Sequence, residues 1–388
     1  MLYDRRRRWI AGFVAALAAA LAAFFLLGAH KAPSARPFVI AASATANEPA
    51  PTLGAADEQR LRDAAESDDS SVLLVSPDGQ SRELPLTPRR ENGQVEHGPQ
   101  HTELINANIK AIRDDMATMS ATHGFDLLDT ISQGVRASAT PGTLLVASST
   151  LSVLGGVDMQ QVLWGADPKA LARDLHHRGL LPDLSSWDVV FTGIGDTMPP
   201  QQPLQYPERR TLKAYWTAIC QEAGAHSCTV NDQPRPEQPS RSPLPVPTVP
   251  VPEITSFQGP HGSRITTLPA DALFAFDSTD IDQAALSVLG ALAADIKTRH
   301  LRVTVTGYAS PDGGTPTYNQ DLSARRAHAV QDALIRLGVD PSVFDSVHGV
   351  GTDGHSPDAC LTNGQVDRAK CAPFRKVVVV TSPSAVTS

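Results

Sequence analysis

The sequence is poor in the residue patterns that mark catalytic, nucleotide-binding and metal sites. Its 388 residues contain no Gly-x-x-x-x-Gly-Lys-Ser/Thr loop, no His-Glu-x-x-His and no Gly-x-Ser-x-Gly. Residues Gly349–Gly354 match Gly-x-Gly-x-x-Gly, but His355-Ser-Pro357 follows where a dinucleotide-binding helix would begin. We therefore expect no enzyme activity and no cofactor. An enzyme working near Ser149 and Asp196 ranks last, because no nucleophile, base or metal set is assembled there.

Aromatic residues and clustered positive charge are also scarce. Aromatics make up 5% of the chain, the net charge is −8, and the only Lys/Arg cluster is Arg5–Arg8. Nucleic-acid binding needs basic patches, and single-strand binding also needs aromatic platforms. We therefore expect no nucleic-acid partner.

Cysteine is rare, and none of the 4 cysteines forms a Cys-x-x-Cys pair. A zinc site with His226 beside Cys228 is therefore disfavoured, and we expect no metal. Four cysteines allow three pairings. The local pairs Cys220–Cys228 and Cys360–Cys371 would each lie within one predicted domain and leave no odd thiol. Disulfides would fit an extracytoplasmic compartment.

The N-terminus has a long apolar run. Trp9–Gly28 carries no charge and is about long enough to cross a bilayer as a helix. Positive charge at Arg5–Arg8 predicts a single-pass signal anchor over residues 1–30, with the N-terminus cytoplasmic and the rest outside. The alternative is a cleaved signal peptide, although the small-residue site Ala42-Ser-Ala44 lies far from the run. Residues 31–70, rich in Ala, Pro, Ser and acids, predict a tether with a short helix near residues 55–66.

Residues 71–231 alternate strand and helix patterns, which predicts a Rossmann-like α/β domain with a mainly parallel sheet. Ligands on such sheets lie at the carboxyl ends of the strands, here the loops Ser148–Ser152 and Gly193–Thr197. The first loop is similar in place to the metal-binding loop of von Willebrand A domains, but it lacks the leading acid. We expect a spacer or a platform for an envelope protein partner. The Pro-rich stretch 232–253 predicts a semi-rigid polyproline II spacer.

The most informative stretch is Gly307–Ala327. A strand pattern, Leu301–Thr306, leads through a polar loop into a helix, for which Thr317 and Gln320 form a capping-box pattern. Arg326 lies on the apolar side of this helix. A buried arginine needs a partner, which is either a carboxylate of the domain or a ligand carboxylate held bidentately.

This stretch resembles the OmpA-like C-terminal domain in its pattern Gly-Tyr-(loop)-Tyr-Asn-x-x-Leu-Ser-x-x-Arg-Ala. The resemblance covers Ile265–Ser382. It includes Leu273–Asp277 as the opening strand, the turn Gly349-Val-Gly351, and Phe374-Arg-Lys-Val377 before the last strand. It implies an α+β domain over residues 254–388, of order βαβαββ, with two helices on a mixed sheet. Asp280 would cap the first helix. The Cys360–Cys371 pair resembles a disulfide of some such domains.

The resemblance also implies a ligand, since the family binds peptidoglycan non-covalently through the diaminopimelate of the stem peptide. Arg326 falls on the family's ligand-binding arginine and Asn319 on its motif asparagine. The family's aspartate, which grips the ammonium group, is replaced by Ser310, and Asp312 would take its role. The expected ligand-binding set is Arg326, Asn319, Asp312, Ser310, Asp277 and Leu322. The resulting hypothesis is a membrane-anchored protein that tethers an envelope complex to the cell wall.

The change at Ser310 supports an alternative hypothesis, in which the chain is an envelope scaffold that kept the fold and lost the ligand. Arg326 would then be satisfied internally, for example by Asp312 or Asp277.

Overall fold

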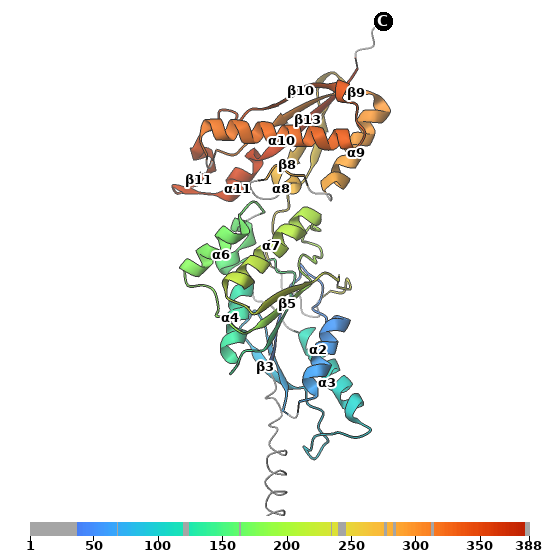
Figure 1. Cartoon of the computed structure of the whole chain (residues 1–388), viewed down its shortest axis with the longest axis vertical. Helices are drawn as coiled ribbons and strands as arrows, with labels where there is room; N and C mark the ends of the chain where they lie inside the picture. The colour runs from blue at the N-terminus through green and yellow to red at the C-terminus, as the bar shows by residue number, and fades with distance from the viewer. Residues whose placement is uncertain are drawn as a thin grey trace, which may run out of the picture.

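A computed structural model shows two bodies of helices and strands arranged end to end (Figure 1). The structure describes residues 37–67, 69–118, 124–162, 164–233, 235–239, 246–274, 278–281, 285–311 and 314–384. The expected signal anchor at residues 1–30 lies outside these ranges. Within them, no helix is long and apolar enough to cross a bilayer.

The first body is a six-stranded sheet covered by helices on both faces (Figure 1). Its elements are β1 (Phe38–Ala42), α2 (Ala55–Ala65), β2 (Ser71–Val75), β3 (Ser81–Pro85), α3 (His101–Met116), α4 (Leu127–Ala137), β4 (Thr143–Ala147), η1 (Gly155–Val157), α5 (Met159–Val162), α6 (Pro168–His177), β5 (Asp188–Thr192), α7 (Tyr206–Glu222) and β6 (Ser227–Asn231). The strand order is β3-β2-β1-β4-β5-β6, and only β3 pairs antiparallel. The Rossmann-like, mainly parallel sheet predicted from the alternating pattern is confirmed.

The predicted start of this domain at residue 71 is wrong, because β1 lies inside the expected tether. β1 pairs with both β2 and β4 in the middle of the sheet. Val39 and Ala41 face one core with α4, α6 and α7, whereas Phe38, Ile40 and Ala42 face the other core with α2 and α3. A strand covered on both faces must be apolar throughout, which explains the run Phe38–Ala42. The short helix expected near residues 55–66 is α2.

The Pro-rich segment after β6 is not a free spacer where the structure describes it. Residues 246–251, here called the strap, lie against the first body. The side-chain amide of Gln201 accepts from Val249 N at 2.7 Å and donates to Val249 O at 2.9 Å. Trp164 Nε1 donates to Pro250 O at 2.7 Å, and Val249 is buried. Because proline has no backbone N–H group, the strap is held mainly through its backbone carbonyl groups, which accept hydrogen bonds from side chains.

The second body is the predicted α+β layer, with one additional strand in its main sheet and a separate two-stranded hairpin. Its elements are β7 (Thr255–Gln258), η2 (Pro260–Gly262), β8 (Arg264–Pro269), α8 (Ala270–Leu273), α9 (Ala285–Arg299), β9 (Leu301–Gly307), α10 (Pro316–Arg336), η3 (Pro341–Val343), β10 (Phe344–Gly349), η4 (Pro357–Cys360), β11 (Leu361–Thr362), β12 (Gln365–Val366), α11 (Arg368–Cys371), η5 (Ala372–Phe374) and β13 (Lys376–Pro383). The five-stranded sheet has the order β10-β9-β13-β8-β7, and only β9 and β10 pair in parallel.

One local prediction in the second body is wrong, and another is not tested by the described residues. The strand expected over residues 273–277 does not begin at Leu273, because Leu273 ends the short helix α8 and Phe274 forms an isolated bridge with Ile281. The sheet strand before this segment is β8, and residues 275–277 lie outside the described ranges. Apolar residues after Pro269 fit a buried helix turn as well as a strand. The expected cap of α9 at Asp280 falls at the edge of undescribed residues, because 282–284 lie outside the described ranges.

Both predicted disulfides are present. Cys220–Cys228 links α7 to β6, and Cys360–Cys371 links η4 to α11.

Candidate functional site

The site begins at the loop between β9 and α10, whose helix starts two residues earlier than predicted. Thr315 is the N-cap, and its hydroxyl accepts from Tyr318 N at 3.2 Å. Pro316 occupies the first helical position, which leaves Thr317 inside the first turn and not at the cap. The predicted capping box of Thr317 and Gln320 is therefore wrong. Gln320 instead donates from Nε2 to Gly349 O at 2.6 Å and ties the helix to β10.

Two glycines let α10 lie directly on the sheet. A Cβ at Gly307, the end of β9, would come 1.9 Å from Ser323 O, and one at Gly349 would come 2.2 Å from Ala324 N. Ser323 is fully buried and its Oγ accepts from Gly351 N at 2.9 Å. The helix, the loop after β9 and the turn after β10 are thus held at a close backbone approach that only glycine allows.

This packing sets the inner face of α10, where Asn319, Leu322 and Arg326 follow one another at helical spacing. All three are buried, with Arg326 6% exposed. The Arg326 guanidinium carbon lies 5.6 Å from the centre of the Phe274 ring, within cation–π range. The predicted position of Arg326 on the apolar face of the helix is confirmed.

Four of the predicted ligand-binding residues line one cleft. Ser310, Asn319, Leu322 and Arg326 lie on the wall of a cavity of about 1270 Å³. The structure therefore brings together the part of the predicted set that it describes. The other two members, Asp312 and Asp277, lie outside the described residues.

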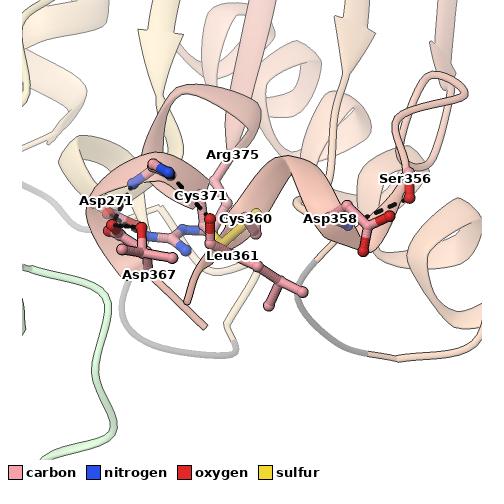
Figure 2. The surroundings of a disulfide bond; sticks show 10 residues. Asp271, Ser356, Asp358, Cys360, Leu361, Asp367, Cys371 and Arg375 are labelled. Atoms are coloured by element: carbon pink, nitrogen blue, oxygen red, sulfur yellow. Dashed lines mark hydrogen bonds and ion pairs between the residues drawn. A yellow bond between two sulfur atoms is a disulfide. The ribbon is translucent and has the colours of Figure 1, made fainter. Parts of the chain in front are cut away.

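The same wall carries an ion pair that the sequence analysis did not identify. Arg375 Nη2 lies 3.2 Å from Asp271 Oδ2, and both side chains are mostly buried. Figure 2 shows this pair beside the Cys360–Cys371 disulfide, which fixes the segment that leads into β13. Arg375 belongs to the Phe-Arg-Lys-Val motif already quoted, so its motif position was the available signal.

The opposite wall of the cleft comes from the first body. Gly156, Gln161, Asp167, Ala170 and Asp174, from the η1–α6 region, all line the cavity. No pattern in the sequence indicated this wall, because it depends on how the two bodies are placed.

The carboxyl edge of the first sheet, where α/β proteins usually hold ligands, is occupied by the chain itself. Arg235, which follows β6, is buried and contacts Glu48 and Asp196 at 3.4 Å each. Glu48 Oε2 also accepts from Ser149 N at 2.6 Å, in the first of the two predicted loops. Arg209 pairs with Asp196 at 2.9 Å. These loops therefore form an internal ion-pair network.

Metal ligands are not clustered in the described ranges, where no group of three or more His, Cys, Asp or Glu could hold an ion. Cys228 is in a disulfide, and His226 Nδ1 lies 2.8 Å from Asp188 Oδ1.

Comparison with known proteins places the second body in a family. Residues 273–363 match the OmpA family. The chain is 34% identical over 102 residues to the peptidoglycan-associated lipoprotein of Pseudomonas aeruginosa, covering 25% of this chain and 60% of that protein. It is 38% identical over 74 residues to the protein of the same name from Pseudomonas putida, covering 19% of this chain and 44% of the other. The chain thus spans less than two thirds of the length of these relatives.

Solved structures resemble the same part of the chain. The periplasmic domain of Helicobacter pylori MotB is 20% identical, with a TM-score of 0.27, and the match covers 35% of this chain and 85% of that domain. The cell wall anchor of the T6SS from Pseudomonas aeruginosa is 22% identical, with a TM-score of 0.28, covering 34% of this chain and 88% of the other. The C-terminal part of the chain is an OmpA-like domain, homologous to that of the peptidoglycan-associated lipoproteins.

Proposed function

We propose that the protein binds peptidoglycan non-covalently through the diaminopimelate of the stem peptide and thereby tethers a membrane or an envelope complex to the cell wall. The observation that carries this proposal is the convergence of Ser310, Asn319, Leu322 and Arg326 on one cleft of an OmpA-like domain. The name that two of its relatives share, peptidoglycan-associated lipoprotein, supports the same ligand class.

The proposed mechanism is capture of a zwitterion. Arg326 binds the carboxylate at the far end of the diaminopimelate side chain, because a guanidinium donates two parallel N–H bonds to a carboxylate. Asp312, helped by Ser310, holds the neighbouring ammonium group. Asn319 orients the loop above α10. This mechanism involves binding alone, so we propose a protein that is not an enzyme and uses no cofactor. Trp9–Gly28 would supply a single-pass membrane anchor, with the OmpA-like domain outside the cytoplasm.

Sedimentation with purified peptidoglycan tests the proposal. Arg326→Ala should weaken binding about 10- to 100-fold, since a hydrogen bond to a charged group contributes about 1.5–3 kcal/mol. The matched control is Arg325→Ala on the outer face of the same helix, where Arg325 is exposed and pairs with Asp321 at 2.9 Å. The assignment of Arg326 would be contradicted if both variants lost peptidoglycan binding equally, or if both bound like wild type.

The ligand class has its own test. Peptidoglycan that carries lysine in place of diaminopimelate keeps the side-chain ammonium but lacks the carboxylate beside it. Wild type should therefore bind the diaminopimelate type at least 10-fold more tightly, and Arg326→Ala should bind both types equally weakly. Equal wild-type affinity for both types would exclude diaminopimelate as the recognised group.

A second candidate function rests on Ser310, which stands where the family has its ammonium-binding aspartate. The chain would then be a scaffold with an OmpA-like fold and no peptidoglycan affinity. In that case, wild type and Arg326→Ala would both remain in the supernatant at every peptidoglycan concentration.

A further inference from the structure

The cleft that holds the proposed peptidoglycan site is lined on its far side by the α/β domain. Ala309, Asn319 and Arg326 line one wall, and Gly156, Gln161 and Ala170 line the other. Its volume of about 1270 Å³ exceeds the roughly 300–1,000 Å³ of ordinary small-molecule sites. A single amino-acid side chain gripped at Arg326 would fill only part of this space.

The two walls are held together by contacts between the domains. α7 packs against α8, and α5 packs against α11, so the helices of the first body meet the cleft side of the OmpA-like domain (Figure 1). Gly165 of the first body lies next to the ion pair of the other domain. A Cβ added at Gly165 would lie 3.1 Å from both Arg375 Nη2 and Asp271 Oδ1, so this position leaves little room for a side chain.

The strap, which connects the two domains along the chain, also holds the two walls of the cleft near each other. Trp164, next to Gly165, holds Pro250, and Gln201 holds Val249 through two hydrogen bonds. Only a few residues separate Val249 from β7, the first strand of the OmpA-like domain. The connection between the domains is therefore fixed to the α/β domain up to the point where the second domain begins, which restricts how far the walls can move apart.

We propose that the α5–α6 segment of the α/β domain is the second half of the peptidoglycan-binding cleft and contacts the part of the ligand that extends beyond diaminopimelate. The exposed residues of this wall include Gln161, Ala170 and Asp174, and Asp167 is half-buried. A polar wall with carboxylates suits the hydroxyl, amide and ammonium groups of a peptide-linked sugar rather than an apolar ligand. This inference rests on the proposed function, because it assigns the α/β domain a role at the same site.

Side chains added to the far wall test the inference without altering the OmpA-like domain. Ala170→Trp should fill the cleft from α6, and the control Lys169→Trp places the same side chain on a neighbouring exposed residue that does not line the cavity. Binding to the full chain would be measured by calorimetry with two probes: free diaminopimelic acid and a soluble disaccharide–peptide fragment of diaminopimelate-type peptidoglycan.

Ala170→Trp should weaken binding of the fragment at least 10-fold and change binding of free diaminopimelic acid less than threefold, with Lys169→Trp like wild type for both. Gln161→Trp, on α5, is the second variant and should behave like Ala170→Trp. Fragment affinities within twofold of wild type for both cleft variants would overturn the inference, whereas the proposed function would stand if Arg326→Ala still weakened binding at least 10-fold. If Arg326→Ala binds both probes like wild type, the proposed function fails and the inference fails with it.

Discussion

Glu208 provides a sharp test of how the domain interface is built. It lies in the first turn of α7, is 1% exposed, and its Oε2 has no hydrogen-bond partner among the described residues. Burial raises the pKa of this carboxyl group, and the charge of Asp271 across the interface raises it further. The backbone N–H groups of Glu208 and Gln205 lower the pKa, but these contacts do not offset burial.

The sign of the pH dependence follows from the raised pKa. The folded protein holds the Glu208 proton more tightly than the unfolded chain, so stability falls as pH rises from the ordinary glutamate pKa to the raised value. Glu208→Gln removes this loss. Glutamine has nearly the same shape, carries no charge to bury and can still accept from the backbone through its amide oxygen.

The expected gain at pH 8 is about 1–2 kcal/mol, because an unsatisfied buried polar group costs about 1–3 kcal/mol. This gain corresponds to a rise in Tm of about 2–8 °C for a domain of this size. At pH 4, below the ordinary glutamate pKa of about 4.3, most of this stability loss is absent, so the gain should become small. Differential scanning fluorimetry from pH 4 to pH 8 measures the difference directly.

The matched control is Glu103→Gln, because Glu103 occupies the same first-turn position of α3 but is exposed. Its Tm should change by less than about 1 °C at every pH, as is usual for surface substitutions. A Glu208→Gln shift that is negative at pH 8, or equal at both ends of the pH range, would refute the argument from burial.

Three further predictions concern stability. Replacing Cys220 and Cys228 by serine should lower stability by about 2–3 kcal/mol, as the loop-entropy relation gives for a short loop, and chemical denaturation measures it. Gly307→Ala should unfold or loosen the OmpA-like domain, because its Cβ would meet Ser323 O at 1.9 Å; loss of the domain's thermal transition would show this. Arg235→Ala should cost about 3–5 kcal/mol, because two carboxylates lose their buried partner, and chemical denaturation of the full chain measures this loss.

The OmpA-like domain was predictable because its signals are local. The motif from Gly307 to Arg326 combines a strand end, a loop and a helix face, and each is recognised from residues close in sequence. Arg326, Asn319 and Leu322 share a face by helical spacing alone, so their convergence needed no knowledge of distant contacts. The exact cap was missed because Thr315 and Thr317 are both good caps, and Pro316 decided between them.

The α/β domain was predictable in type but not in extent. The run Phe38–Ala42 looks like part of a Pro- and Ala-rich tether when seen alone. It is a strand because β2 and β4 pair with it on both sides and two helical layers bury it. A five-residue apolar run carries no information about such distant partners.

By itself the sequence determined the type of the α/β domain, from its alternating periodicity, and the helix face that presents Arg326, from helical spacing. The OmpA-like domain was expected from the resemblance of its motifs, and the two local disulfide pairs were favoured because each lies within one predicted domain. Only the tertiary structure decided that β1 is a central strand, that the Pro-rich strap is held by Gln201 and Trp164, and that α5–α6 faces the cleft. These features depend on contacts between residues far apart in the chain. Such contacts stabilise the fold only after the chain has brought the partner surfaces together, so no local pattern reveals them.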